Sequence, residues 1–591
     1  MDKPVVRISV RNLVEFILRS GDLDNRRGSA DKEAMLKGSR LHRKIQSQMG
    51  SHYRAEVSLK YTTEYDDVSI VVEGRADGIF TEDEQYFIDE IKGVYADVSQ
   101  LEKPVEVHRA QAMCYAWIYA REQQLEKIGV QMTYGNLDTE ELKYFREEFT
   151  LEELKDWYQE LLDRYHKWIS YQLAWKKERN ESMEGLEFPF EYREGQRKIV
   201  SSVYHTISAE RQIFIQAPTG VGKTMSTIFP AVRAVGAGLG ENIFYLTAKT
   251  ITRTVAEEAF LILKEHGLKF KVITITAKEK LCFCDKTECN PENCLWARGH
   301  LDRINDAVYE LWTTQDCYGR ETILEYAKKW QVCPFELCLD LAIWVDAVIC
   351  DYNYVFDPNV YLKRFFGEGT SGGYIFLIDE AHNLVDRGRE MYSAFVDRAD
   401  VLEAKKLAAD YSKGLVRALG KVNRQLLALE KDCGDYEILQ NPGPVSLSML
   451  QVMGEMDKLL EELHGKELPE QLLDFYFCVR DFLNIDELLD ENYVIYSELD
   501  GEGKFRVHLF CVNPAGNLGE FLQKGNSTIF FSATLLPITY YKKLLSTGKE
   551  DYAIYAESPF DVEHRLLMVG GDVSTKYTRR NEEMYQRYAR Y

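Results

Sequence analysis

The segment Ala217-Pro218-Thr219-Gly220-Val221-Gly222-Lys223-Thr224 constrains the fold of this chain more than any other part of its sequence. An apolar run at 213–216 precedes it and a largely apolar stretch at 225–235 follows, which predicts a strand, a tight loop and a helix. Such a loop directs backbone N–H groups and a helix N-terminus at phosphate groups. We therefore expect it to bind ATP, with Lys223 reaching the β- and γ-phosphate oxygens and Thr224 binding Mg²⁺. Ala217 replaces the first glycine of the general pattern, and an ordinary glycine-rich turn is the alternative.

A second apolar run, at 374–378, ends in Asp379-Glu380-Ala381-His382. Acids at the carboxyl end of a strand lie where open α/β sheets bind their ligands. We expect Asp379 to hold Mg²⁺ through water and Glu380 to orient the attacking water, because phosphoryl transfer depends on positioning and charge stabilisation. The alternative is a solvated helix start.

Two further segments resemble motifs of superfamily 2 helicases. The apolar run at 528–531 leads into Ser532-Ala533-Thr534, which resembles the motif that couples hydrolysis to DNA movement. Residues 188–196 resemble the motif on the adenine side of the nucleotide, and the resemblance makes Gln196 the expected reader of the base. Residues 244–250 predict a strand and a loop whose hydroxyl groups and Lys249 amine suit a DNA backbone contact, although a plain strand end is an equal alternative.

The overall charge and the length limit the class of protein. A net charge of −22 argues against a chain that coats nucleic acid through its total charge, so any DNA contact must be a local basic groove. The 591 residues predict about three to five domains. No apolar run is long enough to span a bilayer and no secretory signal is present, which predicts a cytoplasmic protein whose cysteines are thiols or metal ligands.

Eight of the twelve cysteines fall between the phosphate loop and Asp379. Their irregular spacing suits either zinc or a four-cysteine iron–sulfur cluster, but a zinc site usually shows two Cys-x2-Cys pairs, and this sequence has none. Cys350 lies in the apolar run 347–350 and is assigned to the core. The eight are Cys282, Cys284, Cys289, Cys294, Cys317, Cys333, Cys338 and Cys350.

Three segments in this region, Lys280-Leu281-Cys282, Val332-Cys333-Pro334-Phe335 and residues 351–358, resemble the XPD/DinG helicase family. The resemblance implies an ATP-dependent DNA helicase with 5′-to-3′ movement on single strands. It also implies a structural [4Fe–4S] cluster in a small domain that helps to wedge the duplex apart, and a helical arch at 391–505, for which a helical bundle that binds a partner is the alternative. The implied cluster ligands are Cys282, Cys289, Cys294 and Cys333, with Cys284 as the competitor for the first place.

A second site is predicted near the N-terminus. Residues 68–80 and 86–92 read as two strands joined by a turn at 82–85, and this hairpin brings Asp77 beside Glu90. Two carboxylates with Lys92 two residues further on suit metal-assisted phosphodiester hydrolysis. His42 lies on the preceding helix, and Gln111 and Tyr115 lie one turn apart on the next.

The set resembles the RecB-like branch of the PD-(D/E)XK nucleases. The resemblance implies that His42, Asp77 and Glu90 bind Mg²⁺ or Mn²⁺, that Lys92 is catalytic, and that Gln111 and Tyr115 help to place DNA. Cys114 is the only cysteine before Cys282, so this domain is expected to fold without a cluster of its own. A domain that retains only DNA binding is the alternative.

These motifs predict an α/β chain in which a nuclease-like α/β domain precedes a P-loop RecA-like helicase domain with two insertions. The residues after Ser532-Ala533-Thr534 are too few for a second RecA-like domain, whose first strand is expected at 566–569, with a helix at 577–591. The expected domains are the nuclease at 1–185, RecA-like domain 1 at 186–270, 341–390 and 506–545, the cluster domain at 271–340, the arch at 391–505, and the start of an incomplete RecA-like domain 2 at 546–591.

Two functions follow as hypotheses. The first is a DNA helicase with a fused nuclease, which acts on single-stranded or forked DNA in repair or defence. The second is a remnant that binds ATP and single-stranded DNA without turnover. The sequence indicates no particular protein partner.

Overall fold

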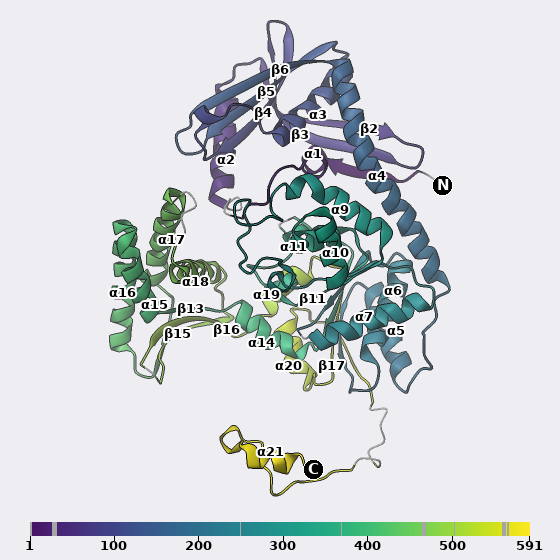
Figure 1. Ribbon diagram of the computed structural model, residues 1–591, viewed down its shortest axis with the longest axis vertical. Coiled ribbons are helices and arrows are strands. Elements are labelled where there is room, and N and C mark those ends of the chain that lie inside the picture. Colours follow the sequence, from purple (N-terminus) through teal and green to yellow (C-terminus); the bar gives the residue numbers. More distant parts are fainter. Residues whose placement is uncertain are drawn as a thin grey trace.

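The computed structural model describes residues 3–25, 32–248, 250–367, 369–463, 468–501, 503–557, 563 and 566–591. Within these residues the chain forms three β-sheets, of six, eight and four strands. Figure 1 shows the six-stranded sheet in the upper part, the large sheet in the centre, and the four-stranded sheet in a lobe at the side.

The N-terminal domain is built on the six-stranded sheet, in which β1, β3, β4, β5 and β6 are neighbours in that order and β2 pairs with β3. The predicted hairpin is confirmed: Glu82 pairs with Gln85, and Asp83 and Glu84 adopt φ of 47° and 66°, as a two-residue turn with both central residues left-handed requires. The elements are β1 (Val5–Ser9), α1 (Val10–Ile17), α2 (Lys32–Gln48), β2 (Tyr53–Glu64), β3 (Ser69–Glu82), β4 (Gln85–Val94), η1 (Val98–Gln100), α3 (Glu106–Gln123), β5 (Lys127–Asn136) and β6 (Leu142–Thr150).

The long helix α4 (Leu151–Glu184) joins this domain to the next. It begins with a capping box, in which the Thr150 and Glu153 side chains bond to each other's backbone N–H. Its first half packs in the N-terminal domain, and near its other end Arg179 forms an ion pair with Asp346, over 2.7 Å and almost fully buried. In between, the Trp168 ring contacts both Phe16 of α1 and Trp344. The two domains therefore share one hydrophobic core.

The central domain is a parallel sheet of eight strands in the order β10-β9-β11-β8-β12-β17-β7-β18. The apolar runs at 213–216, 374–378 and 528–531 are confirmed as β7, β12 and β17, because strands covered on both faces read as continuous apolar runs. The elements are α5 (Gln196–Ser208), β7 (Gln212–Gln216), α6 (Lys223–Gly236), β8 (Asn242–Leu246), α7 (Thr250–Glu265), β9 (Val272–Thr274), β11 (Ala347–Cys350), α12 (Asn353–Phe356), α13 (Lys363–Phe366), β12 (Tyr374–Asp379), α14 (His382–Met391), α19 (Ala515–Leu522), β17 (Ser527–Ser532), α20 (Ile538–Leu545) and β18 (Tyr552–Tyr555).

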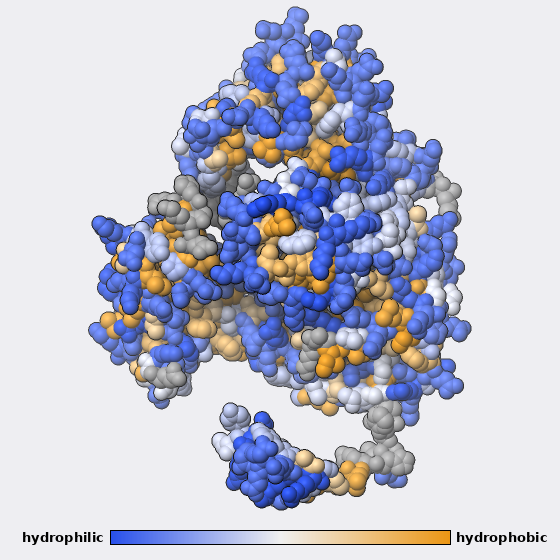
Figure 2. Space-filling model, in the orientation of Figure 1, coloured by the Kyte–Doolittle hydropathy of each residue, from blue (hydrophilic) through white to orange (hydrophobic). Residues whose placement is uncertain are grey.

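The boundary expected at residue 545 falls before the end of this sheet. Strand β18 pairs in parallel with β7, with Tyr552 opposite Ile213, so residues 552–555 belong to the central sheet. In contrast, residues 566–569 form no strand, and their side chains are 64–84% exposed. The prediction of a strand at 566–569 is wrong, because a short apolar run forms a strand only when it pairs with another strand. Figure 2 shows hydrophobic side chains where the chain enters the C-terminal segment. This segment also contains η5 (Tyr577–Arg579) and α21 (Glu582–Tyr588).

The cysteine-rich segment is inserted between β9 and β11. It is mostly helical, and β10 adds to the edge of the central sheet beside β9. The elements are α8 (Lys278–Leu281), α9 (His300–Thr314), β10 (Cys317–Tyr318), α10 (Arg320–Trp330), α11 (Pro334–Leu341) and η2 (Ala342–Trp344).

The side lobe, which the sequence predicts as a helical arch at 391–505, contains strands as well as helices. It contains a four-stranded antiparallel sheet with its own hydrophobic core, and it extends to Cys511. Buried and exposed residues alternate along β16, which is the pattern of a strand with one face on a core. The elements are β13 (Ala394–Asp397), α15 (Arg398–Leu407), η3 (Ala408–Asp410), α16 (Lys413–Asp432), β14 (Tyr436–Leu439), α17 (Pro444–Glu462), α18 (Glu470–Asp486), β15 (Tyr493–Leu499) and β16 (Phe505–Cys511).

None of the helices in the described part of the chain is both long enough and apolar enough to cross a membrane.

Candidate active sites

The phosphate loop connects β7 to α6 as the sequence predicts. Gly220 and Gly222 adopt φ of 85° and 76°, a left-handed conformation that glycine tolerates without steric cost. The Lys223 ammonium donates a hydrogen bond to the Pro218 carbonyl over 3.4 Å and so lies folded over the loop. Burial lowers the pKa of Lys223, and the negative charges of Glu380 and Asp379 act against this shift. The loop is thus arranged around a cation that faces the two predicted acids.

The acids lie at the carboxyl end of β12, two strands away from β7 in the sheet. Asp379 is buried and accepts a hydrogen bond from the Tyr245 hydroxyl over 2.7 Å. Burial raises the pKa of Asp379 to about 6. The Tyr245 hydroxyl also bonds to Thr224, so one tyrosine connects both predicted Mg²⁺ ligands.

Glu380 connects this strand to the next motif. It adopts φ of 48°, which is unusual for a residue with a side chain. The Ser532 hydroxyl donates to Glu380 Oε2 over 3.0 Å, and His382 Nδ1 lies 2.8 Å from the same hydroxyl. The Ala217 N–H donates to the Ser532 carbonyl over 3.0 Å, so the phosphate loop and both later motifs meet at one edge of the sheet.

Gln196 is the first residue of α5 and is almost fully buried. Its Oε1 accepts a hydrogen bond from the Arg193 backbone over 2.7 Å, and its Nε2 lies 2.5 Å from the point where a Cβ on Gly222 would be. Gln196 therefore packs directly on the phosphate loop. A groove beside it is lined by Phe190, Glu191, Tyr192, Arg193, Glu194, Gly195 and Arg197. Aromatic and guanidinium planes of this kind suit a flat base.

The N-terminal site brings together the four residues predicted for its chemistry. His42 on α2 places Nδ1 3.5 Å from Asp77 Oδ1 on β3. On β4, the Lys92 ammonium lies 2.8 Å from Glu90 Oε1. The Ile91 N–H donates to Asp77 Oδ2 over 2.8 Å, which fixes the first acid against the second strand.

Glu90 is the most perturbed group of this site. Burial and then repulsion from Asp77 raise its pKa to about 7, while Lys92 acts in the opposite direction. Within the described residues, the buried Oε2 of Glu90 has no hydrogen-bond partner. The His42 imidazole and the Asp77 carboxylate lie near enough to act on its charge. Leaving a buried carboxylate oxygen unpaired is costly, and a divalent cation would remove that cost. The donor set fits the Mg²⁺ or Mn²⁺ that the resemblance implies.

The pKa of His42 is raised even though burial opposes its protonation, because the hydrogen bond and the charge of Asp77 outweigh burial. A metal ion would displace this proton.

Gln111 and Tyr115, predicted to help place DNA, are buried side chains. Both lie on α3 and are only 3% and 6% exposed. The Tyr115 hydroxyl lies 2.6 Å from the point where a Cβ on Gly74 would be, so its ring packs under β3. Tyr115 therefore supports β3 from behind in this structure, and the role of both residues in placing DNA stays a prediction.

Five of the eight clustered cysteines gather around the loop that follows α8. Cys284 Sγ lies 3.8 Å from Cys294 Sγ, and it also contacts Cys282. The Lys278 ammonium bonds to Cys289 and lies near Cys333. Cys284 therefore lies with Cys282 and Cys294, and Cys289 lies near Cys333 beside Lys278.

The surroundings of Cys333 affect the pKa of its thiol. It is the N-cap of α11, with Pro334 in the first turn. Burial raises the pKa of Cys333 to about 11, whereas backbone N–H groups of Glu336 and Phe335 favour the thiolate. Thiolates held by backbone N–H groups and a nearby lysine suit an iron–sulfur cluster.

The other three cysteines are separate from this group. The Lys264 ammonium donates to Cys317 Sγ over 3.2 Å, and Cys338 is fully buried. Cys350 is buried in β11, which confirms its assignment to the core. In the part of the chain that the structure describes, no three His, Cys, Asp or Glu side chains are arranged as a formed metal site. Both metal assignments therefore stay predictions.

Two functional tyrosines were missed. Tyr245 bonds to Asp379, and the Tyr352 hydroxyl donates to the Asp379 and Glu380 carbonyls. A hydroxyl inside an otherwise apolar strand was the available signal for Tyr245. Lys249, predicted as a DNA contact, lies outside the described residues.

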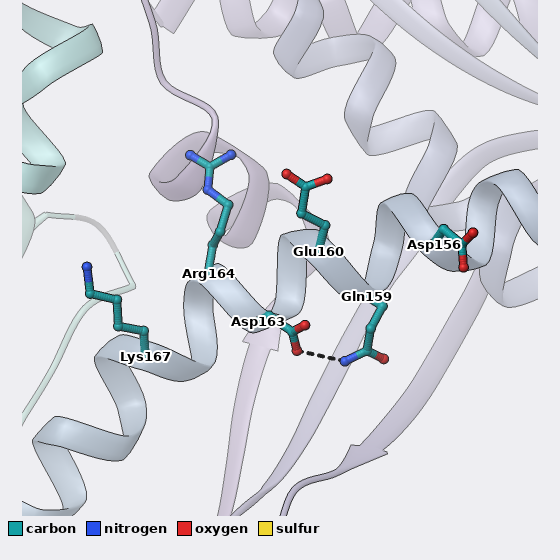
Figure 3. Close-up of a pocket in the computed structure, with 6 residues that line it drawn as sticks. All are labelled: Asp156, Gln159, Glu160, Asp163, Arg164 and Lys167. Atoms are coloured by element: carbon teal, nitrogen blue, oxygen red, sulfur yellow. Dashed lines mark hydrogen bonds between the residues drawn. The ribbon is translucent and has the colours of Figure 1, made fainter.

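A shallow groove on the outer face of α4 carries no candidate site. Figure 3 shows its six lining residues along one helix, with Gln159 donating to Asp163 over 2.8 Å. Arg164 donates to the Ile17 carbonyl over 2.8 Å and so holds α1 against α4. The lining residues are Asp156, Gln159, Glu160, Asp163, Arg164 and Lys167.

Residues 247–401 match the DEAD_2 family model. The chain is 22% identical over 425 residues to the ATP-dependent DNA helicase XPD of Sulfolobus acidocaldarius, covering 68% of this chain and 69% of that protein. It is 29% identical over 116 residues to a Fanconi anemia group J protein homolog of Gallus gallus, which covers 20% of this chain and only 9% of that protein. A solved XPD helicase structure aligns with 67% of the chain and 68% of its own, at 17% identity and a TM-score of 0.42. The chain is therefore similar in sequence to ATP-dependent DNA helicases of the XPD type.

Proposed function

We propose that this chain is an ATP-dependent DNA helicase, carrying an iron–sulfur domain and a fused metal-dependent DNA nuclease. The observation that carries the motor is the meeting of Lys223, Glu380 and Ser532 at the carboxyl edge of one parallel sheet. The DEAD_2 match, which includes the acids and the cysteines, supports the same proposal.

In the motor, the N–H groups of the phosphate loop and Lys223 bind the phosphates of ATP, and Thr224 and Asp379 hold Mg²⁺. Glu380 orients water toward the γ-phosphate. The hydrogen bond that Ser532 donates to Glu380 links this phosphate to the motif that begins at Ser532. Movement in the 5′-to-3′ direction on single-stranded or forked DNA is part of the proposal.

ATP hydrolysis by the full chain tests the motor. We expect single-stranded DNA to stimulate hydrolysis and Lys223→Ala to abolish it. No hydrolysis with or without DNA, in a chain that still binds ATP and single-stranded DNA, would favour the second candidate, which binds both without turnover.

For the cluster domain, we propose Cys282, Cys289, Cys294 and Cys333 as ligands of a [4Fe–4S] cluster, with Cys284 as the alternative to Cys282. The contacts of Cys284 with Cys282 and Cys294, and the position of Cys289 and Cys333 beside Lys278, support this assignment. When bound, the cluster closes the loop and orders the domain. Iron and visible absorbance should be lost in Cys333→Ser and kept in Cys317→Ser. Zinc in place of iron would contradict the assignment.

For the N-terminal domain, we propose Mg²⁺- or Mn²⁺-dependent cleavage of DNA. His42, Asp77 and Glu90 would hold the metal, which supplies a water of lowered pKa and stabilises charge on the phosphate. Lys92 lies against Glu90 and would place its positive charge near the attacked phosphate. Gln111 and Tyr115 would help to place the DNA. Cleavage that survives Glu90→Ala would refute this site.

A further inference from the structure

The imidazole of His108 lies beside the proposed nuclease site and is not one of its predicted residues. His108 is on α3, three residues before Gln111 and seven before Tyr115, so the three side chains follow one stripe of the helix. Its Nδ1 lies 3.1 Å from the hydroxyl of Tyr134 on β5. Tyr134 is the register partner of Lys92, the proposed catalytic lysine on β4. The stripe therefore begins beside the lysine of the site.

Hydrogen bonds around Tyr134 fix which nitrogen of His108 carries a proton. The Tyr134 hydroxyl oxygen accepts a hydrogen bond from the Val105 N–H over 2.9 Å. Tyr134 is only 1% exposed, so its hydroxyl proton is not given to bulk water. Among the described residues, the acceptor within reach of that proton is His108 Nδ1. Nδ1 is therefore the unprotonated nitrogen, and Nε2 carries the hydrogen.

This arrangement makes His108 a neutral donor. Burial, and next the positive charges of Lys92 and Arg11, lower the pKa of His108 to about 4. The ring is therefore uncharged near neutral pH. Because Nε2 already carries a hydrogen, it cannot take a proton from the attacking water, which excludes His108 as the general base.

The N–H donor lies where a phosphate would be attracted. His108 is half-buried and turns its Nδ1 edge to the buried Tyr134, so the edge with Nε2 is the more open one. The described part of the chain supplies no hydrogen-bond partner for Nε2. Lys92 lies close enough for its charge to act on the ring. A neutral donor beside an ammonium suits an oxygen of the DNA phosphate, because both interactions favour negative charge.

We propose that His108 is a further catalytic residue of the nuclease, whose Nε2–H donates to a non-bridging oxygen of the phosphate that is cleaved. Tyr134 is its positioning residue, because its hydroxyl keeps Nδ1 an acceptor. The proposal rests on the proposed nuclease function and extends that function from the metal ligands and Lys92 to the substrate. A neutral donor stabilises charge on the phosphate without repelling the metal ion, as a second ammonium would.

Two variants of the full chain test the donor. His108→Phe keeps a planar ring but has no N–H, whereas His108→Gln supplies an amide N–H at a similar distance from the backbone. We expect His108→Phe to cleave single-stranded DNA about tenfold more slowly, the effect of about 1.4 kcal/mol, and His108→Gln to recover most of the loss. A wild-type rate in His108→Phe would overturn the proposal, as would an equal loss in both variants.

Sulfur at the cleaved linkage tests whether the donor reaches the phosphate. Sulfur is a weak hydrogen-bond acceptor, so the wild type should cleave one of the two phosphorothioate isomers more slowly than the phosphate. The metal ion causes a penalty of its own, and the comparison is therefore made between the two proteins. For that isomer, the penalty should be about tenfold smaller in His108→Phe than in the wild type. Equal penalties for both isomers in the two proteins would contradict the contact.

Tyr134→Phe tests the positioning. In protein with ¹⁵N-labelled histidine, the His108 signal, identified by its loss in His108→Phe, should show an unprotonated Nδ1, and in Tyr134→Phe a mixture of the two tautomers. The cleavage defect of Tyr134→Phe should disappear in the His108→Phe background, because the tyrosine acts through the histidine. An unchanged tautomer in Tyr134→Phe, or defects that multiply in the double variant, would overturn the role of Tyr134.

Metal binding separates this proposal from the function on which it rests. Mn²⁺ should raise the Tm of the wild type and of His108→Phe equally, and that of Glu90→Ala by less. A smaller rise in His108→Phe would make His108 part of the metal site and overturn its role as a phosphate donor. A wild type that binds Mn²⁺ but never cleaves DNA would contradict the nuclease itself, whereas cleavage at equal rates by the wild type and His108→Phe contradicts only the role of His108.

Discussion

The Ser532 hydroxyl donates a hydrogen bond of 3.0 Å to Glu380 Oε2, across two adjacent strands of the central sheet. Glu380 is the proposed partner of the attacking water, and Ser532 begins the motif proposed to follow DNA movement. A single hydroxyl thus connects the chemical step to the element that responds to it.

Ser532→Ala should therefore separate the two processes. We expect ATP hydrolysis without DNA to stay within about twofold of the wild type, and the stimulation by single-stranded DNA to fall about tenfold, the effect of about 1.4 kcal/mol. Ser527→Ala is the matched control, because Ser527 begins the same strand and its buried hydroxyl has no hydrogen-bond partner among the described residues. Equal stimulation in both variants would argue against the connection.

Tyr245→Phe should weaken Mg²⁺ use by the motor. The variant removes the donor to Asp379 and the contact with Thr224 but keeps the ring that packs in the sheet. A free energy of about 1 kcal/mol for one hydrogen bond predicts an approximately fivefold rise in the Mg²⁺ concentration for half-maximal ATP hydrolysis. Tyr374→Phe, at the far end of β12, should leave that concentration unchanged.

Glu90→Gln should abolish DNA cleavage and yet stabilise the metal-free protein. Because the pKa of Glu90 is raised by folding, the native state binds more protons than the unfolded state between the two pKa values. The wild type therefore loses stability as the pH rises from about 4.5 to about 7. The amide carries no such charge, so in chelator the Tm advantage of Glu90→Gln should be larger at pH 8 than at pH 5. An advantage that does not depend on pH would contradict the raised pKa.

Asp346→Ala should be strongly destabilising. Asp346 accepts hydrogen bonds from Arg179, from the Trp175 indole over 2.9 Å and from the Lys271 N–H over 2.8 Å. Removing one partner of a buried ion pair typically costs about 3–5 kcal/mol, because the other charge is left unpaired. We expect a lower Tm and faster tryptic cleavage within α4. Glu178 lies on the same helix and forms an exposed ion pair with Lys269. Glu178→Ala should therefore lower the free energy of unfolding by less than about 1 kcal/mol.

The sequence predicted the parts of the fold that leave a local pattern. Strands β7, β12 and β17 have apolar central residues because helices cover both faces of the sheet, and this pattern places the phosphate loop and the acids on one edge. The hairpin of β3 and β4 could also be predicted from the sequence, because a turn of acidic residues separates its two strands. In each case the information lies within about fifteen neighbouring residues.

Other features depend on distant partners. Strand β18 exists because β7 offers a free edge, and nothing in residues 552–555 alone distinguishes a sheet edge from the start of a new domain. The role of Tyr245 depends on Asp379, which is far away in sequence and adjacent only after the sheet forms. The contact of residues 19–25 with the loop between α8 and α9 left no periodic signal, because it uses backbone groups that every sequence has, such as the Leu23 N–H that donates to the Ala297 carbonyl.

Helix α4 runs without a break from the nuclease core to the motor, over 34 residues, or about 50 Å at 1.5 Å per residue. Because its two halves are buried in different domains, neither of the two proposed catalytic centres can turn or slide without disturbing the shared core. With both proposed activities in operation, α4 would hold the two proposed sites at a fixed separation. The length of DNA between the motor and the cut would then be set by the protein and would be the same for every DNA sequence.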